Sequence, residues 1–181
     1  EYKLHVGLRQ QEIPVPGSPF TLTVLAGQAH SLSTTLPSSM LPLRGVVGFG
    51  EGQGCRHTLQ VMDKMGNECT AGGAKVECLS DSGKVTSKCT DNGDGTYLLE
   101  WNSNDAGTFK ASVTIDGILI KGTPAPLRLA SGTPSLAKTV LEGDGLSSVH
   151  AGKNSICIIK LLDEHSNVAI APPTFRFGMT L

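Results

Sequence analysis

The stretch Thr90-Asp91-Asn92-Gly93-Asp94-Gly95-Thr96-Tyr97 gives the clearest indication of the fold. Its Asn-Gly and Asp-Gly steps supply the positive φ angles that a sharp reversal between β-strands needs. The side chains of Asp91 and Asn92 can also hydrogen-bond the local backbone. The runs on either side, Val85–Cys89 and Thr96–Trp101, are short and favour strands. The stretch therefore predicts a tight turn between two strands.

Further short strands are expected on both sides of this turn, at the spacing of a β-sandwich. They are Ser31–Leu36, Arg56–Met62, Lys75–Leu79 and Phe109–Ile115, followed by a returning stretch through Ile118–Ile120 and Leu127–Leu129 that supplies the seventh strand. In Phe109–Ile115 every second residue is apolar, which is typical of a half-buried strand. In Arg56–Met62 two registers are open, because either Leu59 and Val61 or Thr58, Gln60 and Met62 could face inward. Seven strands with tight turns imply two packed antiparallel sheets.

Composition also indicates an all-β chain. The 181 residues include 22 Gly and 10 Pro, which would interrupt helices too often for a helical bundle. The Pro- and Gly-rich stretch Pro37–Gly54 is expected to be an irregular crossing between strands. A hydrophobic content of 39% and a charged content of 17% are those of a chain that folds.

Charge and hydropathy argue against two classes of partner. The formal net charge is −1, so no overall field attracts nucleic acid. No run approaches the roughly 18 apolar residues that a membrane span needs. The sequence therefore predicts neither nucleic-acid binding nor membrane insertion.

The sequence repeats itself with a period of about 100 residues. Residues 61–67 are echoed at 161–167, with both Asp and Asn recurring. Ser31-Leu32 recurs as Ser135-Leu136, and Pro16–Pro19 is answered by Lys121–Pro124. These offsets predict three parts: the last hairpin of one unit in residues 1–27, a complete unit in 28–131, and the first half of a third unit in 132–181.

Three motifs together resemble the immunoglobulin-like filamin repeat. They are Thr90–Tyr97, Asp105-Ala106-Gly107-Thr108-Phe109 and Gly122-Thr123-Pro124, and Ile13–Phe20 resembles the end of the same repeat. The chain departs from that pattern in Lys121-Gly122-Thr123-Pro124, which replaces the usual Pro-Gly-Ser-Pro. The resemblance implies an immunoglobulin-like sandwich of seven antiparallel strands. It also implies a non-enzymatic scaffold or spacer, located in the cytoplasm, that mediates protein–protein interaction.

The five cysteines show no C-x-x-C pairing, so a structural metal is not expected. Free, partly buried thiols are expected, and the absence of an N-x-[ST] sequon also favours a cytosolic setting. Four cysteines lie within residues 55–89, which leaves disulfides as an alternative. Cys78 and Cys89 lie in neighbouring predicted strands and could cross-link, although the resemblance implies a free thiol at Cys89.

No motif indicates catalysis. Asp91, Asn92 and Asp94 are expected to form a turn, because the pattern of a calcium loop requires Glu where Asn102 stands. The glycines of residues 45–54 lack the spacing of a phosphate-binding loop, and the five histidines are scattered. Trp101 alternates with Tyr97 and Leu99 and is expected in the core. The sequence predicts no catalytic residue, no metal and no cofactor.

A partner is expected at the strands Lys75–Leu79 and Val85–Cys89. In an immunoglobulin-type sandwich these end the two sheets and leave a groove that accepts an extended peptide, a mode known in filamin repeats. The candidate residues are Lys75, Val76, Glu77, Cys78, Leu79, Val85, Ser87 and Cys89. Self-association through the open partial repeats is a further expectation. The alternative functions are an extracellular adhesion module and a docking repeat inside a large ubiquitin ligase.

Overall fold

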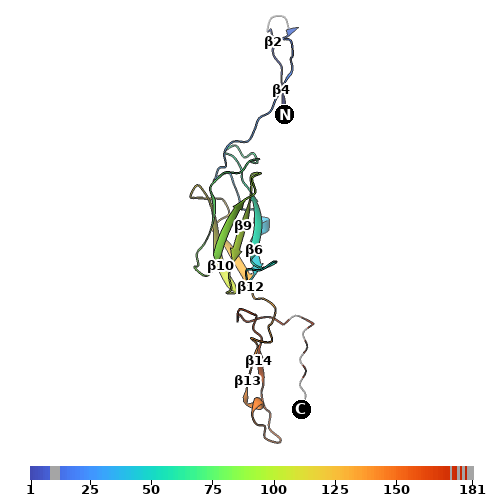
Figure 1. Ribbon diagram of the computed structural model, residues 1–181, viewed down its shortest axis with the longest axis vertical. Coiled ribbons are helices and arrows are strands. Elements are labelled where there is room, and N and C mark those ends of the chain that lie inside the picture. The colour runs from blue at the N-terminus through green and yellow to red at the C-terminus, as the bar shows by residue number, and fades with distance from the viewer. Residues whose placement is uncertain (9–12, 172, 175, 177, 179–181) are drawn as a thin grey trace.

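The computed structural model describes residues 1–8, 13–171, 173, 174, 176 and 178. Parts of the two predicted outer units therefore lie outside the described residues. Two sheets form a sandwich in the middle of the chain, as Figure 1 shows. The smaller sheet has the strand order β6 (Cys55–Gln60), β9 (Thr96–Asn102), β8 (Thr86–Asp91).

The larger sheet is built around the long strand β10 (Gly107–Ile115). One side of β10 carries β11 (Ile118–Leu119) and β12 (Ala125–Ala130), and β5 (Leu43–Val46) follows β12. Its other side carries β7 (Val76–Ser80), because Ala111 pairs with both Ser80 and Ala125. The fold class predicted from the sequence is confirmed: an all-β, immunoglobulin-like sandwich. One pair, β12 with β5, runs parallel, while the other strand pairs in the two sheets are antiparallel.

The core lies between the facing sides of the two sheets. Its largest fully buried side chains are Trp101, Tyr97, Leu36, Leu43, Leu59, Leu99, Ile115, Ile120 and Leu127. The register that the sequence left open is the one with Leu59 and Val61 inward, since both are buried and Thr58 is exposed. Alternation in β9 and β10 follows the predicted period of two.

Two predictions about the start of the central unit are wrong. Ser31–Leu36 is not a strand, because the amide and the hydroxyl of Thr34 both donate to the His30 carbonyl and hold the chain in a turn. The predicted crossing Pro37–Gly54 contains a short 3-10 helix (η1, Ser38–Met40) and strand β5. Leu43 is fully buried there. A side chain at Gly45 would collide with the Gly54 backbone, so this glycine belongs to a closely packed strand.

Two smaller pieces lie at opposite ends of the sandwich in Figure 1. The N-terminal piece pairs β1 (Tyr2–Leu4) with β4 (Phe20–Leu22) and β2 (Gly7–Leu8) with β3 (Ile13–Pro14). The C-terminal piece pairs β13 (Val140–Glu142) with β14 (Ile158–Lys160) and contains helix η2 (Asp144–Leu146). Many of their apolar side chains are exposed. Their assignment to partial units stays a prediction.

Candidate partner-binding site

The predicted partner-binding residues lie on two neighbouring edge strands. β7 pairs with β10 and places Cys78 opposite Val113, while β8 pairs with β9 and places Cys89 opposite Leu99. Among the described residues neither β7 nor β8 pairs with a second strand. The two edges contact each other, although they belong to different sheets. The structure therefore brings the two predicted strands together.

The eight candidate side chains divide into an inward and an outward group. The inward group is Val76, Cys78, Val85, Ser87 and Cys89; the outward group is Lys75, Glu77 and Leu79. In the inward group Cys78 and Val85 are buried, and Ser87 and Cys89 are half-buried. In the outward group Leu79 is 48% exposed. The slot between the edges is therefore shallow, with Ser87 and Cys89 at its opening.

The main chain of β7 offers hydrogen-bonding groups on its free side. The Asp116 amide donates to the Lys75 carbonyl (3.0 Å) and the Asp81 amide to the Lys110 carbonyl (3.1 Å). Because bonding direction alternates along an antiparallel strand, the amides between these points, those of Val76, Cys78 and Ser80, face away from β10. The Val76 amide already donates to the Ala74 carbonyl at 3.0 Å. An added strand would therefore bond to Cys78 and Ser80.

A core tryptophan supports this edge from inside. Trp101 is fully buried, and its indole Nε1 donates to the Leu79 carbonyl across the sandwich at 3.2 Å. The bond joins β9, the middle strand of the smaller sheet, to β7, so it fastens the β7 edge to the opposite sheet. Trp101 is a core residue, as the sequence predicts.

The carboxylates of the acidic turn next to β8 already accept hydrogen bonds from backbone amides. Asp91 accepts bonds from the Gly73 amide (2.7 Å) and the Gly93 amide (2.8 Å), and Asp94 accepts one from the Thr96 amide (3.0 Å). The two amide donors lower the pKa of Asp91. Within the described part of the chain no group of His, Cys, Asp or Glu side chains is arranged to hold a metal ion. These carboxylates act as turn-forming residues.

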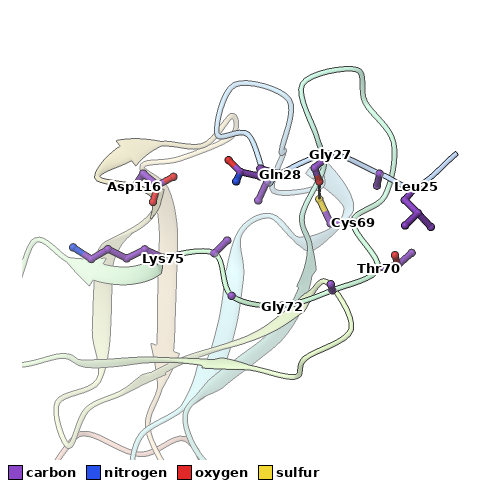
Figure 2. A pocket seen from close by; sticks show the side chains of 13 residues that line it. Leu25, Gly27, Gln28, Cys69, Thr70, Gly72, Lys75 and Asp116 are labelled. Atoms are coloured by element: carbon purple, nitrogen blue, oxygen red, sulfur yellow. Dashed lines mark hydrogen bonds between the residues drawn. The ribbon is translucent and has the colours of Figure 1, made fainter.

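A cavity of about 630 Å³ lies where the N-terminal linker meets the sandwich. Figure 2 shows the linker residues Gly27 and Gln28 together with Cys69, Lys75 and Asp116 around it. The Cys69 thiol donates to the Gly27 carbonyl at 3.5 Å and so ties the linker down. The sequence did not predict this cavity. Much of its lining comes from Gly and Ala residues, which offer little side-chain chemistry to a ligand.

A turn that occurs twice in the chain ties a preceding linker glycine to the segment that follows it. Asp63 accepts bonds from the Gly27 amide (2.9 Å), the Met65 amide (2.8 Å) and the Asn67 amide (2.8 Å). The Asn67 side-chain amide also donates to Asp63 (2.9 Å). This bond has the largest effect, and together with the backbone bonds it holds the pKa of Asp63 well below its usual range. We call residues 63–67 the first Asp–Asn turn.

The same set of bonds recurs in residues 163–167, the second Asp–Asn turn. Asp163 accepts bonds from the Gly132 amide (2.8 Å), the His165 amide (2.9 Å) and the Asn167 amide (2.8 Å). The Ser135 amide donates to the Leu162 carbonyl just as the His30 amide donates to the Met62 carbonyl. His30 therefore corresponds to Ser135, so the structural offset of this segment is 105 rather than the 104 inferred from Ser31-Leu32.

The second Asp–Asn turn also binds the central sandwich. The Asn167 Oδ1 atom accepts a hydrogen bond from the Ala106 amide (2.9 Å), and its Nδ2 donates to the Asn104 carbonyl (2.8 Å). Asn104 and Ala106 lie in the loop between β9 and β10 of the central sandwich. Asn167 is half-buried, whereas Asn67 is exposed. Sequence reasoning noted the recurring Asp and Asn but did not predict this contact.

Comparison with known proteins gives one family match. Residues 52–132 match the model of the family described as Invasin, domain 3. The matched stretch covers most of the central sandwich, including both edge strands. The candidate site therefore lies in the matched part of the chain.

Solved structures of a bacterial integrin-binding protein and of a bacterial adhesin are similar to this chain. Invasin, a bacterial integrin-binding protein, has a TM-score of 0.55 and 18% identity, covering 79% of this chain and 28% of that one. FdeC, an Escherichia coli adhesin, has a TM-score of 0.57 and 18% identity, covering 81% and 45%. The chain thus spans less than half of either protein.

A filamin domain, that of Lin-41, is also similar, with a TM-score of 0.45 and 14% identity over 59% of this chain. The structures with a TM-score above 0.5 support the immunoglobulin-like fold. They do not support the filamin assignment specifically, nor the cytoplasmic location that came with it. In the part of the chain that the structure covers, no helix is long and apolar enough to cross a membrane.

Proposed function

We propose that this chain is a run of tandem immunoglobulin-like repeats of a cell-surface adhesin, acting as a spacer that also carries a protein-binding edge. The match to Invasin, domain 3 and the likeness to adhesin structures support this choice over a cytoplasmic filamin-type scaffold or a docking repeat of a ubiquitin ligase. The observation that carries the spacer role is the contact of Asn167 with the loop of the preceding unit.

This contact suits a protein that must project a binding surface. Asn167 makes one accepted and one donated bond to the backbone of the loop, and Asp163 holds both Asn167 and the linker residue Gly132. Buried or half-buried polar bonds of this kind contribute about 1 kcal/mol each and have a defined direction. They favour one orientation of consecutive units, whereas a free linker would sample many.

The location can be tested directly on cells. An antibody against the central sandwich is applied to intact cells that express the full-length protein, and then to permeabilised cells. We expect labelling of intact cells, and we expect added protease to remove it. Labelling that appears only after permeabilisation would contradict the adhesin proposal and favour the cytoplasmic scaffold.

The protein-binding edge is proposed at β7 and β8, with the eight residues named above. Its support is the free side of β7, where the amides of Cys78 and Ser80 face outward, next to a slot lined by Val85, Ser87 and Cys89. Because the slot is shallow, binding should be weak, roughly micromolar to millimolar. Self-association through the exposed apolar faces of β1 and β4 stays a separate prediction.

Two glutamate variants on β8 test this edge. Ser87→Glu places a charge in the slot, while Thr86→Glu places the same charge on the exposed outer face of β8. Beads coated with each protein are added to cultured epithelial cells and the bound beads are counted. We expect Ser87→Glu to reduce binding at least tenfold and Thr86→Glu to leave it unchanged. Equal binding by both variants would remove the edge as the site, and binding no better than that of albumin-coated beads would exclude an adhesive role.

A further inference from the structure

Two of the five cysteines face each other between the edges of the two sheets. Cys78 pairs with Val113 in the larger sheet, and Cys89 pairs with Leu99 in the smaller one. Val113 and Leu99 are both fully buried, so the side chains of their partners point into the sandwich from opposite sheets. The two strands contact each other, and each thiol shifts the pKa of the other.

The other three cysteines have different surroundings. Cys55 is fully buried on β6, and burial raises its pKa to about 11. Cys69 donates to the carbonyl of Gly27. Cys157 is exposed in the C-terminal piece. All five are free thiols in this structure, but Cys78 and Cys89 are the pair that the fold places side by side.

We propose that Cys78 and Cys89 are a modification site at which a small-molecule disulfide, such as oxidised glutathione, is reduced and a protein disulfide is formed. The bond would join β7 to β8 and so fasten the two sheets together at the edge where no backbone hydrogen bond connects them. It would close a loop of only 11 residues, between strands already connected by a short turn.

The reaction balances in two exchange steps. The Cys89 thiolate attacks one sulfur of the small disulfide, so that a mixed disulfide forms on Cys89 and one thiolate leaves. The sulfur of Cys78, as it gives up its proton, then attacks the Cys89 sulfur and expels the second small thiol. Two protein thiols are oxidised and one small disulfide is reduced to two thiols.

The surroundings of the two thiols fit these roles. Cys89 is half-buried at the opening of the slot, where a small disulfide can reach it, and Cys78 lies behind it with 9% of its surface exposed. The interaction between them lowers the pKa of Cys89, whereas the same interaction and burial raise the pKa of Cys78. Attack by the thiolate is thus expected at Cys89 first, with Cys78 as the resolving thiol.

The experiment uses the whole chain. Reduced protein is incubated with oxidised glutathione, denatured in an alkylating reagent, digested, and analysed by mass spectrometry. We expect a peptide in which Cys78 and Cys89 are joined, with Cys55 and Cys69 alkylated. We also expect oxidation to raise the melting temperature of the sandwich by roughly 5–10 °C.

Two serine variants serve as controls. Cys89→Ser should lose both the cross-link and the rise in melting temperature, while Cys157→Ser should keep both. The proposal does not depend on where the protein is located, because the oxidant is added in vitro. It is overturned if Cys78 and Cys89 both remain alkylatable, if the bond joins another pair, or if glutathione stays on Cys89 without resolution by Cys78.

Discussion

The central sandwich and the C-terminal piece each contain an Asp–Asn turn, but they differ in how deeply the strand before the turn is buried. Asp63 and Asp163 accept the same backbone bonds, and each fixes its own linker glycine. Yet Leu59 is 1% exposed, whereas Ile159, at the corresponding position of the repeat, is 38% exposed. The turn depends on five consecutive residues, while the core around Leu59 depends on strands tens of residues further along the chain. The structure that neighbouring residues determine can therefore be compared here with the structure that depends on distant strands.

The largest expected effect separates the two cores. Leu59→Ala should destabilise the central sandwich by about 3 kcal/mol, because it leaves a cavity in a closed core. Ile159→Ala should cost about 0.5 kcal/mol or less, because its side chain is already partly in water. Denaturant unfolding followed by the fluorescence of Trp101, the only tryptophan, measures the first, and circular dichroism measures both. Equal losses would show that the C-terminal piece is closed by strands that this comparison does not include.

Acid should act on the two turns alike. In Asp63 the bonds from Asn67 and Gly27 lower the carboxyl pKa; in Asp163 burial raises it, but the bonds from Asn167 and Gly132 outweigh burial. The folded pKa thus lies below the unfolded value of about 3.9. The stabilisation is complete well above that value and is lost progressively as the pH falls below about 4.

This acid response can be followed through the linker amides. The nuclear magnetic resonance signals of the Gly27 and Gly132 amides should both stay constant down to about pH 4 and shift below it. Asp63→Asn should abolish the shift of Gly27 and leave that of Gly132. A midpoint above pH 4 at either amide would contradict the assigned hydrogen bonds.

A smaller effect should separate the two asparagines. Asn167→Ala removes the acceptor of the Ala106 amide, so hydrogen exchange of this amide should become about tenfold faster, equivalent to roughly 1.4 kcal/mol. Asn67→Ala removes only the side-chain bond to Asp63 within its own turn and should leave Ala106 unchanged. Exchange of Ala106 that is equally slow in both variants would show that Asn167 does not hold the two units together.

The smallest effect is expected at the tips of the turns. Met65 and His165 occupy the same position of the repeat and use only their amides to bond the aspartate. Alanine at either position keeps that amide, so the free energy of unfolding should change by about 0.5 kcal/mol or less. Thermal denaturation checks this, and a loss above about 1 kcal/mol would reveal a side-chain role.

Much of the central sandwich could be predicted from sequence because its signals are local. Alternation in β9 and β10 and the turn chemistry of Asp91–Gly95 each depend on a few adjacent residues. The two edge strands followed from the order of strands in an immunoglobulin-type sandwich. Strand β5 was missed because its partner, β12, lies more than 80 residues away along the chain. In addition, Gly45 within β5 is a residue type that usually indicates a loop.

The remaining differences have the same origin. The register of β6 depends on which of its faces points toward the opposite sheet. Its own sequence did not decide this, because both faces carry apolar residues. The contact of Asn167 with the Ala106 amide joins two units, and the sequence only showed that the asparagine recurs. The resemblance to filamin depended on motifs whose residues form turns between strands. Such motifs predict the fold correctly but do not distinguish one family of sandwiches from another.

The parallel pairing of β5 with β12 has a mechanical consequence. β5 lies near the start of the sandwich and β12 at its end, and four consecutive residue pairs join them, from Leu43 with Leu127 to Val46 with Ala130. When tension is applied through the two linkers, these strands are pulled in opposite directions along their length. All the bonds between them are then loaded together in shear and cannot peel apart one at a time. A unit of this kind resists stretching along the chain far better than its modest size suggests.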